Sequence, residues 1–593
     1  MDKNQTHNEK MLAQNLNRLW SCLIIDEFIK NNITHFYISP GMRNAPLLAA
    51  LSHLKNFHPE INLDICMDER GASYRALGYT KATGKPCVLV CTSGTAMANY
   101  MPAVVEGKKS NLPLIILSAD RPPELTFCDD NQTMDQTKFY GDYIQGEMNL
   151  GAPSEEISPL ALTSSLSNLI HKSLFPKKGP VHFNCAFREP LEDTKLPIKE
   201  DYLKLAHKQI NRTGPSTKYI DLETSPSLES LRDIYEILKK SQTGLLVIGS
   251  LAPHETRGKK LETIKNFIKA LNWPTYFDVS SSLKYEFNLN DGALPTFDHP
   301  EFQDMLVSHP PETVFHIGGR LTSKHYYSFL KKVPHIQLMT LSLNTEKEDP
   351  SHHTKVRINA HIDSTLKKIL ELFESKTFAP KTLAYDFKSF TETKIKLIDE
   401  GPLAYPSISK TIIDTIPDGS NLYIGNSTVV RTFDAYFSYQ TRKKLNIATN
   451  RGVSGIEGFI ASACGFIDGH NEDVYLIVGD VAFIHDLNSL SLLKSLKKNL
   501  KIILINNDGG GIFTLLPIHK EKDVLDIITS PHGLTFESVA PMFSLHYQCA
   551  KNRSEFKDQL LECINYKGHM VFEVIIDHET NKLVYDQLKT IKL

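Results

Sequence analysis

Short apolar runs alternate with longer helix-like stretches along most of this chain. In the first third, a helix-like segment at Met11–Asn31 precedes apolar runs at His35–Ile38, Cys87–Cys91, Leu114–Leu117 and Val181–Cys185. Short buried runs separated by helical patterns are typical of βαβ units, in which helices cover parallel strands. The pattern therefore predicts an α/β fold with a mainly parallel sheet.

The same alternation continues in two further blocks. Their apolar runs lie at Gly244–Ser250, Thr313–Leu321, Val474–Val478, Lys501–Ile505 and His569–Asp577. A polar stretch broken by prolines, 196–227, follows the first block and is predicted to be a linker. We therefore predict three consecutive α/β domains, at 1–195, 196–375 and 376–593. The pattern leaves open whether the three are alike.

Size and composition are those of a multidomain globular protein. A chain of 593 residues is too long to fold around a single hydrophobic core. Its content of 41% hydrophobic and 23% charged residues is ordinary for a globular protein. A net charge of −2 gives no reason to expect a nucleic-acid partner.

Cysteine usage and the lack of targeting signals indicate the compartment. The nine cysteines are odd in number and show no C-x-x-C spacing, which favours reduced thiols over disulfides or a zinc site. The start of the chain is polar, and the longest uncharged stretch, Pro86–Val105, contains Gly94 and Pro102 and makes a poor membrane span. We predict a cytoplasmic protein with no membrane partner.

Polar residues follow two apolar runs of the third block. Asp480 follows one run, and Asn506-Asn507 with a glycine-rich turn follows the next. Taken alone, Asp480 is at least as readily explained as a helix cap as by metal binding. Asn506-Asn507 alone is explained as a turn. Because ligands bind beyond the carboxyl ends of parallel strands, the pair together favours Mg²⁺ bound to a phosphate-bearing ligand. The main-chain carbonyl of Gly509 is a candidate third ligand.

An acidic pair precedes a helix-like run in the first block. Asp68 and Glu69 stand before Ala72–Thr83. Both acids suit the positive end of a helix dipole, and spacing alone favours that role. The alternative places Glu69 in a dry pocket, where it exchanges a proton with a heterocycle. Likewise, the small-residue turn Thr92–Ala96 either caps a helix or offers backbone amides to a ligand.

Five basic residues lie at predicted loop ends. Each is either an ordinary solvated charge or a group placed to bind a carboxylate, for which arginine is well suited. Five together indicate an enzyme whose substrates carry several carboxylates. They are Arg43, Arg121, Lys324, Arg431 and Arg451.

With these motifs assembled, the chain resembles the thiamine diphosphate enzymes. The GD…NN pattern is similar to their metal-diphosphate motif, with Val481 where a third glycine is usual. More narrowly, the chain resembles the 2-succinyl-5-enolpyruvyl-6-hydroxy-3-cyclohexene-1-carboxylate synthase (MenD) family of menaquinone biosynthesis. The matching segments span both outer blocks and include SPGMRNAPL, DERGASYRALGYTKATGKP, SADRPPEL, GNSTVVR, NRGVSGIEG and NNDGGGIFTLLP. The middle block resembles the family only weakly.

The resemblance implies a role for each matching residue. Glu69 bonds the aminopyrimidine ring, and Asp480, Asn507 and the Gly509 carbonyl hold Mg²⁺ or Mn²⁺. Ser427, Ser454 and Ile456 contact the cofactor. Glu69, Arg43, Arg431 and Arg451 are the implied catalytic set. The substrate-side positions are Arg43, Arg121, Asn131, Gln132, Lys324, Arg431, Arg451, Ile512 and Phe513.

The resemblance also implies a reaction. It is a thiamine diphosphate- and Mg²⁺-dependent, C–C bond-forming transfer that decarboxylates 2-oxoglutarate and joins the four-carbon unit to isochorismate. The implied assembly is a homodimer or homotetramer with cofactor sites at the subunit interface. Two departures put substrate affinity in question: Met42 stands where many members have serine, and His325 where a second basic residue is expected.

Two other functions stay open. One is another thiamine diphosphate enzyme, such as a 2-oxoacid decarboxylase or an acetolactate-type synthase, although small substrates need fewer basic residues. The other is a catalytically inactive binding or regulatory subunit that kept the fold. A plain Mg²⁺-phosphate hydrolase fits less well, because the chain has no P-loop lysine motif.

Overall fold

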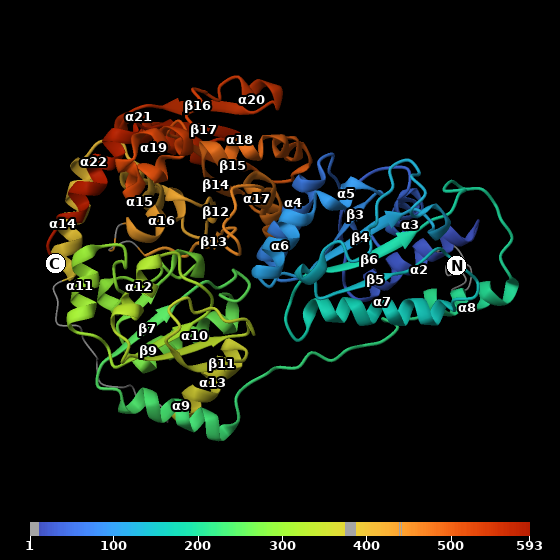
Figure 1. Ribbon diagram of the computed structural model, residues 1–593, viewed down its shortest axis with the longest axis horizontal. Helices are drawn as coiled ribbons and strands as arrows, with labels where there is room; N and C mark the ends of the chain where they lie inside the picture. Colours follow the sequence, from blue (N-terminus) through green and yellow to red (C-terminus); the bar gives the residue numbers. More distant parts are fainter. Residues whose placement is uncertain (1–10, 374–386, 438, 440–441) are drawn as a thin grey trace.

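Three parallel β-sheets with helices packed against them organise the chain (Figure 1). The structure is a computed structural model that describes residues 11–373, 387–437, 439 and 442–593. Within the first sheet, alternate residues face two different cores: Tyr37 and Leu89 pack in one, and Phe36 and Val88 in the other. Both faces are therefore buried, which explains why its strands are continuous apolar runs.

The first sheet has the strand order β2-β1-β3-β4-β6-β5, and every pairing is parallel. Its strands are β1 (His35–Ser39), β2 (Asn62–Ile65), β3 (Cys87–Cys91), β4 (Leu114–Asp120), β5 (Gly146–Asn149) and β6 (Val181–Ala186). The main helices packed with it are α2 (Leu16–Lys30), α3 (Ala45–Lys55), α4 (Glu69–Thr83), α6 (Met101–Lys109), α7 (Pro159–Leu174) and α8 (Glu200–Ile210).

The middle sheet has the order β11-β10-β9-β7-β8 and is also parallel. Its strands are β7 (Gly244–Ile248), β8 (Thr275–Phe277), β9 (Thr313–Ile317), β10 (Gln337–Ser342) and β11 (Thr354–Asn359). Its helices are α9 (Leu228–Lys240), α10 (Gly258–Leu271), α11 (Pro300–Ser308), α12 (Lys324–Lys332) and α13 (Ile362–Leu372).

The third sheet has the order β13-β12-β14-β15-β17-β16, the same as the first sheet. Its strands are β12 (Asn421–Ile424), β13 (Asn446–Ala448), β14 (Val474–Gly479), β15 (Leu500–Asn506), β16 (His546–Ala550) and β17 (Met570–Ile575). Its helices include α14 (Phe387–Glu400), α15 (Tyr405–Thr415), α16 (Thr428–Ala435), α17 (Phe459–His470), α18 (Asp480–His485), α19 (Lys522–Thr529), α21 (Arg553–Asn565) and α22 (His578–Lys589).

The prediction of three α/β units with parallel sheets is confirmed. Numbered within each unit, all three sheets begin with the order 2-1-3-4, and the outer two end with 6-5 where the middle one has a single strand. The predicted linker 196–227 contains α8, whose Tyr202, Ala206 and Ile210 pack into the first core. The domain limits at 195 and 375 stay predictions, and residues 375 and 376 lie outside the described ranges.

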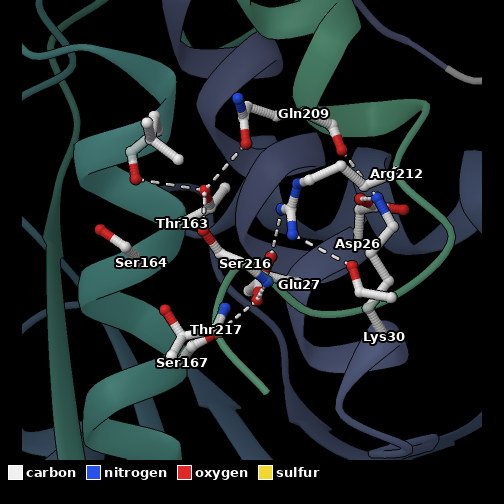
Figure 2. Close-up of polar contacts among 12 residues, drawn as sticks. Asp26, Glu27, Lys30, Thr163, Ser164, Ser167, Gln209, Arg212, Ser216 and Thr217 are labelled. Carbon is white, nitrogen blue, oxygen red and sulfur yellow. Dashed lines mark hydrogen bonds and ion pairs between the residues drawn. The ribbon is translucent and has the colours of Figure 1, made fainter.

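A buried carboxylate fastens the segment that leaves the first unit (Figure 2). Glu27 on α2 is fully buried and accepts hydrogen bonds from the Ser216 amide at 2.7 Å, the Arg212 guanidinium at 2.7 Å and the Ser167 hydroxyl. A buried charge without such donors costs several kcal/mol. Glu27 therefore fixes the path of the extended chain that runs toward α9 (Figure 1).

Two glycines let helices of the first and third units pack backbone to backbone. A Cβ atom on Gly78 of α4 would lie 1.9 Å from the Ser462 carbonyl oxygen, and one on Gly465 of α17 would lie 1.7 Å from the Arg75 carbonyl oxygen. The contact is reciprocal, and the Arg75 guanidinium also pairs with Asp468 at 2.8 Å. Only glycine fits at such approaches. The two outer units therefore form one body within the chain.

Candidate active site

The structure brings the predicted metal ligands together at the ends of β14 and β15. These strands are paired in register up to Gly479 and Ile505. Asp480 begins α18, and its Oδ2 accepts the backbone N–H groups of Asn507 at 3.0 Å and Gly509 at 2.9 Å. The side chains of both Asp480 and Asn507 are buried. The two strand ends therefore form one compact polar site.

The side chain of Asn507 reaches two oxygens of this site, those of Gly509 and Asp480. One terminal atom of its amide lies 2.9 Å from the Gly509 carbonyl oxygen and 3.2 Å from Asp480 Oδ2. If that atom is the amide nitrogen, it donates a hydrogen bond to each of the two oxygens. If it is the amide oxygen, three oxygens lie together with no hydrogen between them. Three converging oxygens suit a hard cation such as Mg²⁺ or Mn²⁺.

The predicted cofactor loops lie at neighbouring strand ends in a strained backbone conformation. Ser427 precedes α16 with φ 64°, and Ser454 lies beyond β13 with φ 60°. Residues other than glycine rarely adopt this conformation, and it concentrates at functional sites. The Asn426 amide joins the two loops by donating to the carbonyls of Asn450 at 2.7 Å and Gly455 at 2.8 Å.

The geometry of α4 separates the two acids that the sequence left ambiguous. Asp68 is the helix cap, and its side chain accepts the Gly71 N–H at 3.2 Å. Glu69 is the first helical residue and is half-buried, and its side chain makes no hydrogen bond to any described residue. Beside it, Ile65 and Met67 are 68% and 78% exposed. Glu69 is thus available to a ligand at an apolar, uncovered surface.

Two predicted substrate-side arginines lie together on the first unit. Arg121 donates to the Ser93 hydroxyl at 2.8 Å, to Asp130 at 2.9 Å and to the Asn131 carbonyl. The buried Arg43 donates to the Phe187 carbonyl at 2.9 Å, and its Nε–H has no partner in the described part of the chain. Burial, with the like charge of Arg121, lowers the pKa of Arg43. An anionic ligand would relieve that repulsion.

The small-residue turn 92–96 belongs to this same group. Its Ser93 carbonyl accepts the Gln132 amide at 2.9 Å, and Gln132 itself has φ 57°. The Gly94 N–H, however, is already bonded to Gln136 at 2.8 Å. The turn therefore positions Arg121 and Gln132.

The other arginines lie where the middle and third units meet. Arg431 on α16 donates to the Ser427 carbonyl, which joins it to the cofactor loop. Burial lowers the pKa of Arg451; nearby Asp278 opposes this shift, and the charges of Arg431 and Arg320 add to it. These basic groups are close enough to interact, as a site for several carboxylates requires.

Two fully buried aspartates hold the middle unit against this arginine group. Asp278 accepts the backbone N–H of Thr322 and its hydroxyl, the latter at 3.0 Å, and so fixes the segment that leads to Lys324. Asp434, three residues after Arg431, accepts the Val279 N–H at 2.9 Å and lies 3.5 Å from Lys284 Nζ. The two aspartates therefore fasten the segments before Lys324 and after Arg431, while Lys324 itself is exposed.

The structure does not join every predicted residue in one place. Among described residues, no hydrogen bond or ion pair connects Glu69, Arg43 or Arg121 with Asp480 or Arg431. Three further predicted residues, Ile456, Ile512 and Phe513, lie on the third unit; Ile456 is 37% exposed and the other two are half-buried. The contacts of the described residues therefore join the predicted residues into two groups, here called half-sites, one on the first unit and one on the third; Arg70, next to Glu69, bonds the His485 carbonyl of α18 at 2.7 Å.

The two departures from the family pattern differ in exposure, His325 being half-buried and Met42 exposed. His325 Nε2 lies 3.8 Å from Asp298, and burial lowers the pKa of this ring, so His325 is mostly uncharged near neutral pH. Met42 is 64% exposed.

Several residues of the site were missed in the sequence. Asp278 follows β8 directly, the same strand-end signal that marked Asp480, and it was overlooked. Asp434, Arg320 and His532 carry no such signal, because they come from a helix and two loops. His532 lies 3.2 Å from Asp480 although 52 residues separate them.

The fold is that of the thiamine pyrophosphate enzymes. Three profiles of that class match in order: the N-terminal TPP binding domain at residues 21–139, the middle domain at 206–424 and the C-terminal TPP binding domain at 424–574. Two solved structures share the fold at 15% identity. They are a putative thiamin diphosphate-dependent enzyme from Mycobacterium smegmatis (TM-score 0.67, 93% of this chain and 98% of that one) and benzoylformate decarboxylase from Polynucleobacter necessarius (0.69, 94% and 98%).

Curated relatives define the family more narrowly. The 2-succinyl-5-enolpyruvyl-6-hydroxy-3-cyclohexene-1-carboxylate synthase of Syntrophus aciditrophicus is 38% identical over 98% of this chain and 100% of its own length. The synthase of the same name from Chlorobium phaeovibrioides is 34% identical over 97% of each. The chain belongs to the 2-succinyl-5-enolpyruvyl-6-hydroxy-3-cyclohexene-1-carboxylate synthase family, and the predicted family is confirmed.

Proposed function

We propose that this chain decarboxylates 2-oxoglutarate and adds the four-carbon unit to isochorismate, which gives 2-succinyl-5-enolpyruvyl-6-hydroxy-3-cyclohexene-1-carboxylate for menaquinone biosynthesis. The observation that carries the proposal is the end-to-end match with synthases of that name at up to 38% identity. The oxygen set at Asp480, Asn507 and Gly509 supports it, because an inactive subunit has no need to keep that set.

Thiamine diphosphate is the cofactor of this proposal, held through a divalent cation. Asp480, Asn507 and the Gly509 carbonyl would hold Mg²⁺ or Mn²⁺, and Ser427 and Ser454 lie in the loops beside them. When bound, thiamine diphosphate supplies the electron sink that loss of CO₂ from a 2-oxo acid requires. Glu69 would hold a proton at the aminopyrimidine nitrogen, and Ile456 would support the ring.

The basic residues would orient the substrates. The two substrates, 2-oxoglutarate and isochorismate, together carry four carboxylates. The basic residues that would bind them are Arg43 and Arg121 on one side and Lys324, Arg431 and Arg451 on the other. Guanidinium groups bind carboxylates in two-point contacts that fix orientation as well as position. Asn131 and Gln132 would add neutral hydrogen bonds. Ile512 and Phe513 would exclude water near the reacting carbon.

A second copy of the chain would complete each site, in a homodimer or homotetramer. Glu69 and Asp480 belong to separate half-sites in one chain, and each half-site has uncovered apolar neighbours. Ile65 and Met67 flank Glu69, and Val453, 44% exposed, lies near the Ser454 loop. Burying such residues against a partner is favourable by roughly 25 cal/mol per Å².

We place the enzyme in the cytoplasm. All nine cysteines are free thiols, which is typical of a reducing compartment. No helix in the described part of the chain is long and apolar enough to cross a bilayer.

The direct test combines purified protein with thiamine diphosphate, Mg²⁺, 2-oxoglutarate and isochorismate. We expect CO₂ and the succinylated product in equal amounts. Mass spectrometry measures the product, and CO₂ capture measures the gas. CO₂ release without the adduct would contradict the synthase proposal and favour a plain 2-oxoacid decarboxylase. No cofactor binding in calorimetry would favour the inactive subunit.

A further inference from the structure

A histidine that no part of the proposed mechanism uses touches the metal-binding carboxylate. His532 lies in the loop after α19, and its Nε2 is 3.2 Å from Asp480 Oδ2. Its side chain is 13% exposed, and its ring packs edge-on against Phe536 with centroids 6.0 Å apart. The imidazole is thus held in one place beside the site.

The backbone fixes the tautomer of this ring. The Leu534 N–H points at His532 Nδ1 at 3.0 Å, so Nδ1 accepts and carries no hydrogen. In the neutral ring the hydrogen must then be on Nε2, which donates to Asp480. A neutral donor orients the carboxylate and leaves its negative charge available to a cation.

A second carboxylate holds the loop itself in position. Asp508 Oδ1 accepts the backbone N–H groups of His532 at 2.9 Å and Gly533 at 2.6 Å. Asp508 follows Asn507 directly and adopts φ 57°. The Gly510 N–H also donates to the Thr529 carbonyl at 2.6 Å. The metal-site turn and the histidine loop are therefore joined at several points.

We propose that His532 is a positioning residue for the metal site: its Nε2–H holds the Asp480 carboxylate in the orientation that a divalent cation needs. This inference rests on the proposed function, because it takes Asp480 to be a metal ligand. Hydrogen-bond partners of metal ligands contribute about 10- to 100-fold to metal affinity. His532 would contribute to affinity for the cation and make no contact with substrate.

The test measures Mn²⁺ affinity by the EPR signal of free Mn²⁺, with thiamine diphosphate present at saturation. His532→Leu keeps the bulk and removes the donor, and should weaken Mn²⁺ binding about 10- to 100-fold. His532→Gln places an amide N–H near the position of Nε2 and should stay within about threefold of the unmodified protein. His532→Asn is too short and should behave like the leucine variant.

A matched control and a kinetic readout separate positioning from general damage. His519, whose ring contacts the Leu516 carbonyl, should tolerate leucine without a change in Mn²⁺ affinity. In His532→Leu, the Mg²⁺ concentration for half-maximal activity should rise by the same factor, while kcat at saturating Mg²⁺ stays within about twofold.

Three outcomes would overturn the inference, and they differ in what else they contradict. Unchanged Mn²⁺ affinity in His532→Leu, or equal affinity in the glutamine and asparagine variants, overturns the role of His532 alone. If the leucine variant does not fold, the glutamine and asparagine pair still decides the question. Unmodified protein that binds no Mn²⁺ with thiamine diphosphate contradicts the proposed metal site as well.

Discussion

The first and third units share a sheet with the same strand order, yet their strand ends carry different chemistry. The strand β14 leads into Asp480, while its counterpart β3 leads into the Ser93 turn. The strand β13 leads toward Arg451, while its counterpart β2 leads to Glu69. One sheet order thus carries a buried carboxylate and amide at its strand ends in the third unit, and an acid with two arginines in the first unit.

This difference shows that the fold supplies position and the loops supply function. Parallel strands bring their carboxyl ends to one edge whatever residues follow them. In the proposed function the two half-sites complete one another across two subunits. The comparison can be tested by removing one half at a time.

The largest effect is expected at the third unit. Asp480→Asn removes the charge that a cation needs and should lower kcat/KM by about 1,000-fold. The equivalent change in the first unit, Ser93→Ala, removes one hydrogen bond to Arg121 and should cost no more than about tenfold. Steady-state kinetics with calorimetric titration of thiamine diphosphate and Mg²⁺ measures both. Equal losses would mean that the two edges are not specialised.

Glu69→Gln should act on the cofactor without releasing it. The variant should still bind thiamine diphosphate. The C2 proton of the bound cofactor should exchange about 100-fold more slowly, because a general acid–base group accelerates proton transfer by at least that factor. NMR of the exchange gives the rate. Asp68→Asn is the matched control, since asparagine caps helices as well as aspartate does. An unchanged rate in Glu69→Gln removes this residue from its proposed role.

Mixing the two inactive variants tests whether the half-sites combine across subunits. If each site takes Glu69 from one copy and Asp480 from another, a Glu69→Gln/Asp480→Asn heterodimer has one intact site. Statistical mixing should then recover about a quarter of the unmodified activity. Co-refolded or co-expressed chains are assayed against each variant alone. Absence of recovery in confirmed heterodimers places both halves in the same chain.

A glycine change tests the contact between the two units. Gly78→Ala should destabilise the protein by about 3 kcal/mol, because its Cβ would meet the Ser462 carbonyl at 1.9 Å. Gly214→Ala is the control, since a Cβ there meets nothing within 4 Å. Urea unfolding followed by circular dichroism compares the midpoints. Equal midpoints would show that α4 and α17 separate at little cost.

The smallest effect is expected where the chain departs from its family. His325→Arg should change the KM for either substrate by less than about threefold, because residue 325 faces Asp298, and an arginine there would pair with that carboxylate. Arg431→Lys, at a site that favours two-point binding, should raise KM by about tenfold. A tenfold improvement in His325→Arg would place this residue in the substrate site.

The sequence predicted much of the fold and part of the site. Strand and helix positions were accessible because hydrophobic periodicity is local, and Asp480 and Asn507 were accessible because each follows an apolar run. The role of Glu69 came only from the resemblance to the family, since its spacing alone favours a helix cap. The site's assignment to one family depended on long motifs in the outer blocks. Helix α8 was missed because a polar, proline-flanked stretch gives a weak periodic signal.

The sequence by itself determined the three parallel sheets, the strand ends that carry polar groups and the family. The tertiary structure decided that Asp68 is the cap and Glu69 is free, that the arginines form two groups, and that His532 holds Asp480. The reason is physical: a residue's place on a strand or helix depends on its neighbours in sequence. The partners of a loop side chain depend on how distant segments pack.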